Sequence, residues 1–565
     1  MKLLKKTMPE NGCSMYLLYP EGSPRTPFKR RSIALLMDDT CEENVRAVLE
    51  KLELDVLSRE KELILYVPIL PGKAWDEMSF ADCAALYRAC EAQCNKPAPG
   101  PMETNEVGIP TLRAMMNAWH PMNDAKYVIG LGSGADVAVT LAACTPVNIA
   151  AIMADGGKLM TTVGLTDAPV PACLYHADPM TALYFRHSNG ENLHERKGCY
   201  DTWASGNNPW QRTFFPDDNA VMDAQAIRDV WTWVFAPVRR TNTCIYGDVE
   251  PAMDHSFRDF ELFIEDNRLG DDTPHTWFTY LPKCLREGER KQVPLVIFFH
   301  GGTDNPAEAA DMSKLHELGD REGFITVYPW GTNRCSWNNA MEPEGKDDAR
   351  FSGLLIDYML KNYPVDPERV YITGFSNGAA MAQVTALLYP DKVAGLFHVD
   401  SNWPGAYGGK YLSVTEQDVT PFRLGFELKK KFDYLMPVWY TYGAREMSFP
   451  IFRACTQQNQ YDLWKKYNHI AIRETPQLGQ ENPNGCGVEG ENREMCFPSS
   501  RHPHHRYQVE RFYTNDAAHL NLYNLTIMYD KGHEVAEKDL ELGWNYIKHF
   551  RRLADGSLVT DEKDE

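Results

Sequence analysis

A serine lies between two glycines in residues 374–378 (GFSNG), the motif in this chain with the clearest chemistry. Residues 370–373 before it are mostly β-branched or apolar, and residues 379–388 after it are small and helix-forming, which predicts a strand, a tight turn and a helix. Such a turn exposes the serine hydroxyl above a sheet edge, and the glycines remove side chains that would clash. The motif predicts that Ser376 is a nucleophile, with an ordinary structural turn as the alternative.

A second motif supplies hydrogen-bond donors. Residues 295–299 (LVIFF) are expected to form a buried strand, and residues 300–303 (HGGT) follow at its carboxyl end. Acyl transfer places negative charge on a carbonyl oxygen, and the amides of a glycine-rich loop can approach that oxygen closely. We therefore expect an oxyanion hole formed by amides near Gly302 and Thr303 together with the amide of Asn377.

A histidine late in the chain is the expected base, because a serine on such a turn is followed by the acid and then by the histidine. His533 fits this order, since it lies between apolar residues 525–529 and the last expected helix. Other histidines fit less well, and they are His502, His504, His505, His519 and His549. Glu446 is the expected acid because it follows the expected strand at 438–442. The neighbouring Arg445 could instead pair with Glu446 in an ordinary salt bridge.

These motifs resemble the poly(3-hydroxybutyrate) depolymerase and feruloyl esterase group of α/β-hydrolases. The resemblance also rests on SWNN at 336–339, on VDPERVYITGFSNGAAMA at 365–382, and on GHE followed by GWNYIKHF near the end. It covers about residues 275–552 except 475–515. It implies a carboxylesterase that uses a Ser–acid–His triad without a cofactor; a peptidase and an acyltransferase are alternatives within the same chemistry.

Two departures from the group's pattern stand out. Residues 442–446 read YGARE where the group commonly has His-Gly-x-x-Asp, which bears on the acid. Secreted members often have a cysteine before the nucleophile that bridges a cysteine near the tryptophan. Here Phe375 takes that place, so the resemblance gives Cys335 no such partner.

The elements that must position these groups occur twice. Residues 127–138 (YVIGLGSGADVA) resemble residues 371–382 (YITGFSNGAAMA), and the two segments align without a gap as far as Pro146 and Pro390. Two more pairs follow in the same order: PACLY at 171 with PVWYT at 437, and the helices around Trp231 and Trp544. Short apolar strands that alternate with helical stretches are typical of a doubly wound parallel sheet.

The sequence therefore predicts two tandem α/β-hydrolase-type doubly wound domains. We expect the first in residues 1–245 and the catalytic one in 255–555. Residues 475–515 are rich in Pro, Gly, Asn, Glu and His, which predicts a loop or lid inserted in the second domain.

The first copy is expected to be degenerate. Ser376 aligns with Gly132, and the His-Gly-Gly segment is matched with Leu70-Pro71-Gly72, which lacks the paired glycines. Asp178 would be a remnant of the acid. Residues 130–135 also fit G-x-G-x-x-A, and Asp155 follows about twenty residues later, so a nucleotide- or partner-binding module is the alternative of a different class.

Several aromatic residues lie in or beside segments that end near the expected active-site edge. Trp337, Trp403 and His300 are the expected substrate-binding residues, and Trp330, Trp439, Tyr440 and Tyr442 lie close to the same edge. Ligands of a doubly wound sheet bind outside the carboxyl ends of its strands. Aromatic walls would favour aryl or other bulky acyl groups, with core packing of these rings as the alternative.

Composition limits the location and the partners. The net charge of −20 argues against a nucleic-acid partner, and no segment reaches the ~18 apolar residues of a membrane span. The 14 cysteines are scattered and the N-terminus lacks an apolar leader, so we expect reduced thiols in the cytoplasm. Cys90 and Cys94 have helix spacing and no second pair, so no metal site is expected. The expected partner is a small-molecule ester, and the oligomeric state is left open.

Overall fold

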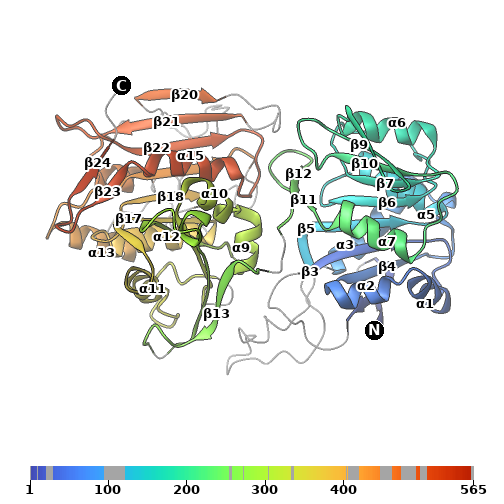
Figure 1. The fold of residues 1–565 in the computed structure, drawn as a ribbon, viewed down its shortest axis with the longest axis horizontal. Helices are drawn as coiled ribbons and strands as arrows, with labels where there is room; N and C mark the ends of the chain where they lie inside the picture. Colours follow the sequence, from blue (N-terminus) through green and yellow to red (C-terminus); the bar gives the residue numbers. More distant parts are fainter. Residues whose placement is uncertain are drawn as a thin grey trace. The chain divides into compact units, whose positions relative to one another are not determined.

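The computed structural model divides the chain into two compact units, Met1–Asp254 and His255–Glu565 (Figure 1). It describes all residues except 1, 9–10, 21–29, 95–120, 254–256, 272, 303, 333–335, 402–403, 405–418, 446–460, 473–490, 497–505 and 562–565. Each unit is an α/β structure built on one large mixed sheet.

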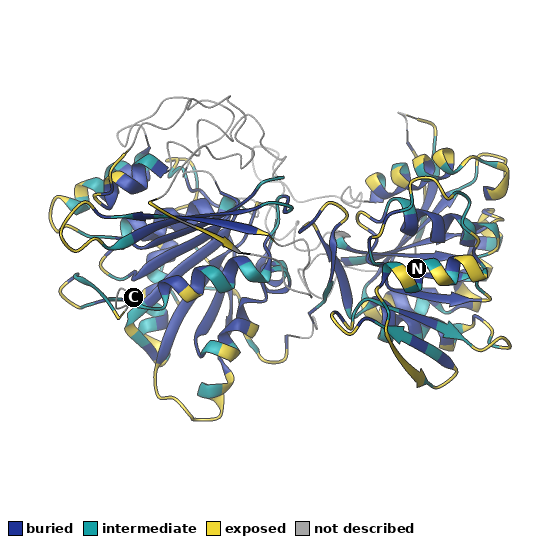
Figure 2. Ribbon diagram, turned by 90° about the horizontal axis from the view of Figure 1, so that it is seen from above, coloured by how far each residue is buried: buried dark blue, intermediate teal, exposed yellow. Residues whose placement is uncertain are grey.

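The first unit is built on a ten-stranded sheet. Its six central strands are parallel, and in spatial order they are β4, β3, β5, β6, β7 and β10. In spatial order the strands are β1 (Lys2–Thr7), β2 (Ser14–Tyr19), β4 (Ile64–Ile69), β3 (Arg30–Leu36), β5 (Pro121–Gly130), β6 (Ala151–Asp155), β7 (Ala172–Tyr175), β10 (Arg212–Pro216), β9 (Tyr200–Ala204) and β8 (Leu193–Lys197). The central strands are almost wholly buried, because helices cover both faces of the sheet (Figure 2).

Helices of the first unit fall into two groups, one on each face. The first group consists of α1 (Glu42–Lys51), α2 (Leu54–Lys61) and α7 (Ala224–Val230). These helices share one apolar core with η2, a π-helical turn at Trp231–Phe235. The other group consists of η1 (Trp75–Glu77), α3 (Phe80–Cys94), α5 (Ser133–Cys144) and α6 (Pro179–Ser188). A hairpin of β11 (Val238–Thr241) and β12 (Asp248–Pro251) follows.

The second unit repeats this strand order. Its sheet runs β13 (Phe260–Asp266), β14 (His275–Tyr280), β16 (Ile325–Pro329), β15 (Val293–Phe299), β17 (Val365–Phe375), β18 (Gly395–Val399), β19 (Val438–Gly443), β22 (Asn521–Met528), β21 (Tyr507–Tyr513) and β20 (Asn492–Cys496). The strands from β16 to β22 are again parallel, and the outer strands are antiparallel.

The second unit's helices pack in two sets. α11 (Asp348–Asn362) and α13 (Thr420–Lys429) pack against α12 (Asn377–Leu388), and α10 (Leu315–Glu322) packs against α15 (Glu537–Ile547). The remaining elements are α8 (Lys283–Arg286), α9 (Pro306–Ser313) and a hairpin of β23 (Phe550–Arg552) and β24 (Leu558–Thr560). Among the described residues, no helix is both long and apolar enough to cross a membrane.

A buried arginine of the terminal hairpin recurs in the two units. Three backbone carbonyls at corresponding places accept from each guanidinium: those of Ile149, Pro169 and Gly247 from Arg240, and those of Val393, Leu435 and Gly556 from Arg552. Arg240 donates to the Tyr246 carbonyl as well. Because a buried charge needs such partners, each arginine fixes its hairpin to the strand ends beneath it.

An aromatic contact recurs as well. Tyr127 meets the edge of Trp231 with ring centroids 6.0 Å apart, and Tyr371 meets Trp544 at 5.5 Å. The Tyr127 hydroxyl donates to the Val238 carbonyl, and the Tyr371 hydroxyl donates to the Phe550 carbonyl. Each acceptor is the first residue of the hairpin that ends its unit. The two units therefore share strand order and the contacts that hold the last helix on the sheet.

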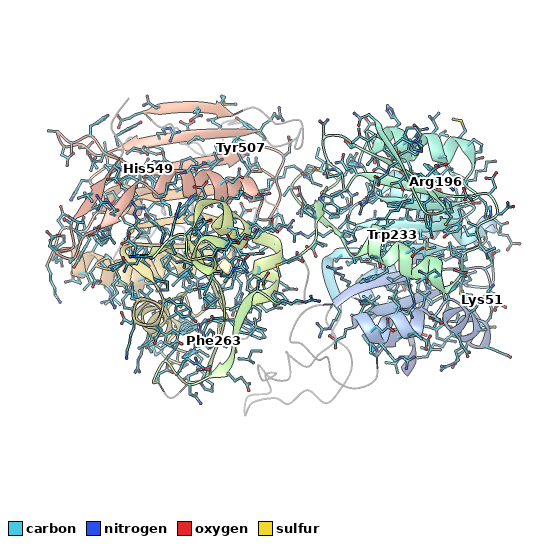
Figure 3. All side chains as sticks on the ribbon, viewed as in Figure 1. Lys51, Arg196, Trp233, Phe263, Tyr507 and His549 are labelled. Carbon is cyan, nitrogen blue, oxygen red and sulfur yellow. The ribbon has the colours of Figure 1, made fainter. Side chains whose placement is uncertain are left out.

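Residues 475–515, expected as a loop or lid, contribute two strands to the sheet edge. β20 and β21 lie in this segment, and Tyr507, labelled in Figure 3, begins β21. In β21 the apolar Tyr507 and Val509 alternate with the polar Gln508 and Glu510, and all four side chains are buried. The local abundance of polar residues hid that alternation.

His398 in β18 is a buried histidine whose ring stacks on Tyr440 at 4.6 Å. Among the described atoms, neither ring nitrogen meets a hydrogen-bond partner. Burial disfavours the charged ring and lowers the pKa of His398 from 6.5 to about 3.

The depressed pKa of His398 predicts an acid-sensitive fold. The contribution to stability is complete above the unfolded pKa of 6.5 and is lost as the pH falls toward the folded value of about 3. Between about pH 6.5 and pH 5 this loss of unfolding free energy should amount to about 2 kcal/mol. Urea unfolding of the full chain should show a weaker loss of stability over this range in His398→Phe than in wild type. The exposed His519 provides the control variant His519→Gln, and an equal acid loss in all three proteins would contradict the assignment.

Candidate active site

Ser376 occupies the turn between β17 and α12. Its backbone lies in the left-handed region, with φ 54° and ψ −120°, and its amide donates to the Val399 carbonyl of β18 at 3.0 Å. A non-glycine residue in this region is strained by about 1–3 kcal/mol, and such strain persists only where the surroundings enforce it. The turn places the hydroxyl at the carboxyl edge of the sheet and next to the N-terminus of α12.

Two glycines allow the helix to approach the sheet this closely. A Cβ on Gly378 would lie 2.1 Å from the Phe299 carbonyl oxygen, and one on Gly374 would lie 2.6 Å from the Gly378 carbonyl oxygen. Both obstacles are backbone atoms that no side-chain rotation can move. The G-x-S-x-G spacing is therefore a packing requirement in this chain.

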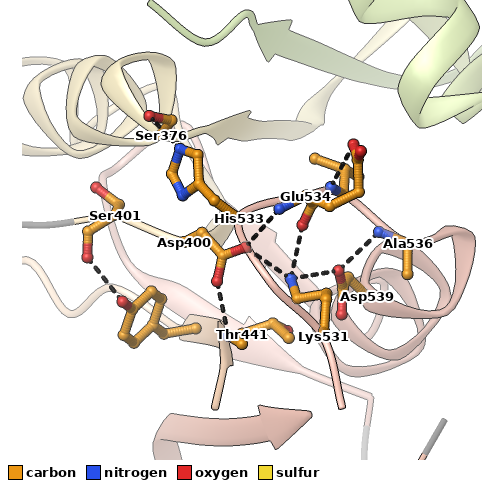
Figure 4. A network of polar contacts seen from close by, with 12 residues as sticks. Ser376, Asp400, Ser401, Thr441, Lys531, His533, Glu534, Ala536 and Asp539 are labelled. Carbon is orange, nitrogen blue, oxygen red and sulfur yellow. Dashed lines mark hydrogen bonds and ion pairs between the residues drawn. The ribbon is translucent and has the colours of Figure 1, made fainter. Parts of the chain in front are cut away.

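His533 stands next to Ser376. The distance between His533 Nε2 and Ser376 Oγ is 2.9 Å, and the ring extends toward the hydroxyl (Figure 4). Phe375 packs against the imidazole with ring centroids 4.6 Å apart. Phe375 takes the position where secreted members of the esterase group often have cysteine. In this chain it supports the His533 ring.

Two of the rival histidines are described, and each lies in another part of the unit: His549 is in the turn between α15 and β23. His519 stacks on Tyr513 with ring centroids 4.7 Å apart, next to the edge strand β21. His502, His504 and His505 lie outside the described residues.

His300 organises the loop that follows β15. It is fully buried, and its Nε2 accepts the Gly331 amide at 2.9 Å, so the neutral ring carries its proton on Nδ1. Nδ1 then donates to the Gly301 carbonyl oxygen at 2.6 Å. The peptide between Gly301 and Gly302 is trans, so its carbonyl and its N–H point in opposite directions. The hydrogen bond on Gly301 therefore turns the Gly302 amide away from the histidine.

Gly302 and Asn377 lie side by side, as an oxyanion hole requires. A Cβ on Gly302 would meet Asn377 Cβ at 3.7 Å, an ordinary contact. The side-chain oxygen of Asn377 accepts the Trp337 amide at 2.6 Å. Thr303, the third expected donor, lies outside the described residues.

The aromatic residues expected to bind substrate are mostly packed inside the unit. Trp337 is 2% exposed, and its indole N–H donates to the His300 carbonyl at 2.9 Å. Both ring nitrogens of His300 serve the loop described above. The other expected rings are also buried, and they are Trp330, Trp439, Tyr440 and Tyr442. Trp403 lies outside the described residues. Trp337 and His300 therefore hold the loops around Ser376 together. None of the described aromatic residues that were expected to line a substrate pocket is exposed.

Glu446, the expected acid, lies outside the described residues, but the turn before it is described. The Arg445 amide donates to the Lys531 carbonyl at 2.9 Å, and its guanidinium donates to the Asp530 carbonyl at 3.1 Å. A Cβ on Gly443 would lie 2.5 Å from the Gly532 carbonyl oxygen. The turn that leads to Glu446 therefore packs directly on the loop that carries His533.

Sequence reasoning missed one carboxylate of the site. Asp400 directly follows β18, the neighbour of the nucleophile strand, and it contacts Gly443, Lys531 and Glu534 (Figure 4). The signal was present in the sequence, since the apolar run at 393–399 ends in this aspartate. Carboxylates at the ends of parallel strands gather at one edge of a sheet.

The first unit has the same turn without the serine. Gly132 has φ 59° and ψ −135°, close to the angles of Ser376, and it precedes α5 as Ser376 precedes α12. Leu36 pairs with Gly130 as Phe299 pairs with Gly374, so β3 is the counterpart of β15. The counterpart of the His-Gly-Gly segment is therefore at residues 37–39, and its assignment to Leu70-Pro71-Gly72 was wrong. That segment follows β4, which precedes β5 in sequence but is not paired with it in the sheet.

A carboxylate stands at this turn of the first unit. Asp38 accepts the Ser133 amide, at 3.1 and 3.2 Å from its two oxygens, and also the Ser133 hydroxyl. A Cβ on Gly132 would lie 2.0 Å from Asp38 Oδ2, so the carboxylate lies directly over the turn. The anion therefore occupies the helix N-terminus that a phosphate or an oxyanion would need.

The other first-unit candidates have structural partners. Asp155 binds His176, with its Oδ1 2.8 Å from Nδ1 of the ring. The nucleotide-binding alternative would instead require this carboxylate to face a ribose. Asp178 caps α6 by accepting the amides of Met180 and Thr181. These contacts account for both aspartates without a ligand.

Residues 277–413 match the family model described as Esterase PHB depolymerase. The chain is 38% identical over 120 residues to Poly(3-hydroxyalkanoate) depolymerase C of Paucimonas lemoignei, which covers 20% of this chain and 29% of that protein. It is 36% identical over 105 residues to an acetylxylan esterase of Coprinopsis cinerea (17% and 27%) and 27% identical over 134 residues to feruloyl esterase B of Talaromyces funiculosus (23% and 37%). These matches confirm the resemblance seen in the sequence.

The matches are partial. The chain spans well under half the length of these curated relatives. Among solved structures, the acetyl xylan esterase from Aspergillus awamori aligns with 51% of this chain and 99% of its own at 17% identity, with a TM-score of 0.33.

Proposed function

We propose that the second unit is a serine carboxylesterase that uses Ser376 as its nucleophile. The observation that carries the proposal is the 2.9 Å approach of His533 Nε2 to Ser376 Oγ at a strained strand-to-helix turn. A surface serine has no need of a left-handed backbone, of two flanking glycines or of a histidine within hydrogen-bond distance. A serine nucleophile at a strand-to-helix turn of the G-x-S-x-G type has all three.

The reaction follows from the positions of these groups. His533 takes the hydroxyl proton as Ser376 attacks the ester carbonyl, and the amides of Gly302 and Asn377 hold the negative oxygen. The alkoxide leaves with the proton from His533, and an acyl group remains on Ser376. Water, activated by the same histidine, then releases the acid. Glu446 is proposed to orient the imidazole and to stabilise its charged form.

We also propose that the first unit is a degenerate copy of the second. The shared strand order, the recurring arginine and the matching angles at Gly132 and Ser376 support a duplication. Glycine at the turn removes the nucleophile and relieves the strain, and Asp38 places a negative charge where an oxyanion would form. A hole that holds a carboxylate cannot stabilise a second anion.

A short acyl group such as acetyl is the proposed substrate type. Two of the relatives described above are an acetylxylan and a feruloyl esterase by name, so the family leaves both acyl classes open. The expectation of an aryl preference rested on aromatic rings that the structure places in the core, with Trp403 as the exception that is not described. Among the described residues, none of the expected rings is left to stack a bulky acyl group.

Replacing the nucleophile is the first test. Ser376→Ala should lower the turnover of p-nitrophenyl acetate by at least ~10³-fold, because only binding and the oxyanion hole remain. Ser133→Ala in the first unit is the matched control and should keep wild-type turnover. Substantial activity in Ser376→Ala, or its loss in Ser133→Ala, would contradict the proposed site.

Replacing the acid is the second test. Glu446→Gln should lower kcat by about 10²–10⁴-fold, because the amide cannot stabilise the imidazolium. Asp433→Asn and Asp530→Asn are the controls, since these carboxylates pair with Lys429 and His469 and with Arg506. If Asp530→Asn were the inactive variant instead, the acid would have to be placed elsewhere.

The acyl group can be identified by comparing two esters of one alcohol. The kcat/KM for the acetyl ester should equal or exceed that for the feruloyl ester, because no described ring supplies the roughly fivefold advantage that one stacking contact of ~1 kcal/mol would give the feruloyl group. Trp337→Ala should leave this ratio unchanged, because the buried ring holds a loop. A feruloyl preference that disappears in Trp403→Ala would show that an aromatic wall selects the acyl group after all.

A further inference from the structure

Asp400 has a positive φ, which is uncommon outside glycine. It follows β18 with φ 46°, in the left-handed region, and is 6% exposed. Its amide donates to the Thr441 carbonyl of β19 at 2.9 Å. Aspartate is among the residues that adopt a positive φ when the short side chain forms hydrogen bonds to nearby backbone groups, as here.

The two carboxylate oxygens bind two different loops. Oδ1 accepts the Gly443 amide at 2.7 Å, in the turn after β19. Oδ2 accepts the Glu534 amide at 3.2 Å and lies 2.9 Å from the Nζ of Lys531, in the loop after β22. The three contacts close a connection between chain segments that are far apart in sequence (Figure 4).

Lys531 makes this connection ionic. Its ammonium lies 2.9 Å from Asp400 and 2.9 Å from Asp539, and all three side chains have no exposed surface. It also donates to the Glu534 carbonyl at 2.8 Å. Burial acts to lower the pKa of Lys531, but the two carboxylates outweigh it and hold that pKa above its usual value. The lysine is therefore charged at neutral pH.

The segments joined in this way are the ones that carry the reacting groups. Glu534 is the residue after His533, and Gly443 lies three residues before Glu446. Val399, the residue before Asp400, accepts the Ser376 amide. One carboxylate thus links the nucleophile's strand neighbour, the turn before the acid and the histidine loop.

We propose that Asp400 is a positioning residue that sets the distance between His533 and Ser376 by fixing the three loops to one another. The inference rests on the proposed esterase function and names a residue that the triad itself does not include. Because misplacement of a reacting group by about 1 Å can cost about 10²-fold in rate, a fixed loop geometry has a direct catalytic value.

Asp400→Asn and Asp539→Asn form a matched pair of variants. Each removes one of the two carboxylates around Lys531 and leaves the other as a one-to-one ion pair, so both variants change the buried charge equally. Asp539 additionally accepts the Ala536 amide at the start of α15 and contacts neither the turn after β19 nor the Glu534 amide in the described structure. A difference between the two variants therefore reports on the loops and not on the ion pair.

Positioning predicts a kcat effect. In the full chain, Asp400→Asn should lower kcat for p-nitrophenyl acetate by about 10–10²-fold and change KM by less than about threefold. Asp539→Asn should stay within about threefold of wild type in kcat. Asp400→Glu keeps the charge but shifts the carboxylate, and it should lower kcat in the same direction, which keeps the test decisive if Asp400→Asn does not fold.

Three results would overturn the inference. Equal kcat losses in Asp400→Asn and Asp539→Asn would indicate a purely structural ion cluster. Wild-type kcat in both Asp400 variants would show that the loops need no such link. A loss in Asp400→Asn as large as that of Ser376→Ala, with Glu446→Gln still active, would make Asp400 the acid itself. Wild-type protein with no esterase activity would instead contradict the proposed function, on which the inference rests.

Discussion

The left-handed backbone at Ser376 is the constraint on which the rest of the second unit depends. The turn must pass from β17 into α12 beneath the end of β15, and only glycines at 374 and 378 leave room for the backbone to do so. The strain of about 1–3 kcal/mol is offset by the strand pairing on both sides of β17 and by the buried helix that follows. In return the hydroxyl stands clear of the sheet edge, where groups from other strand ends can reach it.

The first unit has the same strand-to-helix turn, with Gly132 in place of the serine. Gly132 takes nearly the same angles as Ser376, and glycine adopts them at little cost. Asp38 then satisfies the amide of Ser133 at the helix N-terminus, where the second unit keeps Gly301 and Gly302. The fold and the hairpin arginine are therefore shared by both units, while Ser376, the pair Gly301 and Gly302, and His533 are the groups that the proposed reaction uses.

The sequence predicted what is local and periodic. The G-x-S-x-G turn, the apolar strands and the helices are each written within about a dozen residues, and the α/β class follows from their alternation. It could not predict that Trp337 and His300 face inward, because their partners lie in other loops. Asp400 escaped for the same reason, since its role comes from Gly443 and Glu534, and β20 and β21 escaped because polar residues dominate their neighbourhood.

The most direct test of the account is to trap the covalent intermediate. The full chain, mixed with p-nitrophenyl acetate and quenched in acid within the first turnover, should carry one acetyl group, and peptide mass spectrometry should place it on Ser376. The adduct should disappear as hydrolysis proceeds to completion. An acetyl group on Ser133 or on any other residue, or turnover of the ester without an adduct on Ser376, would contradict the central claim.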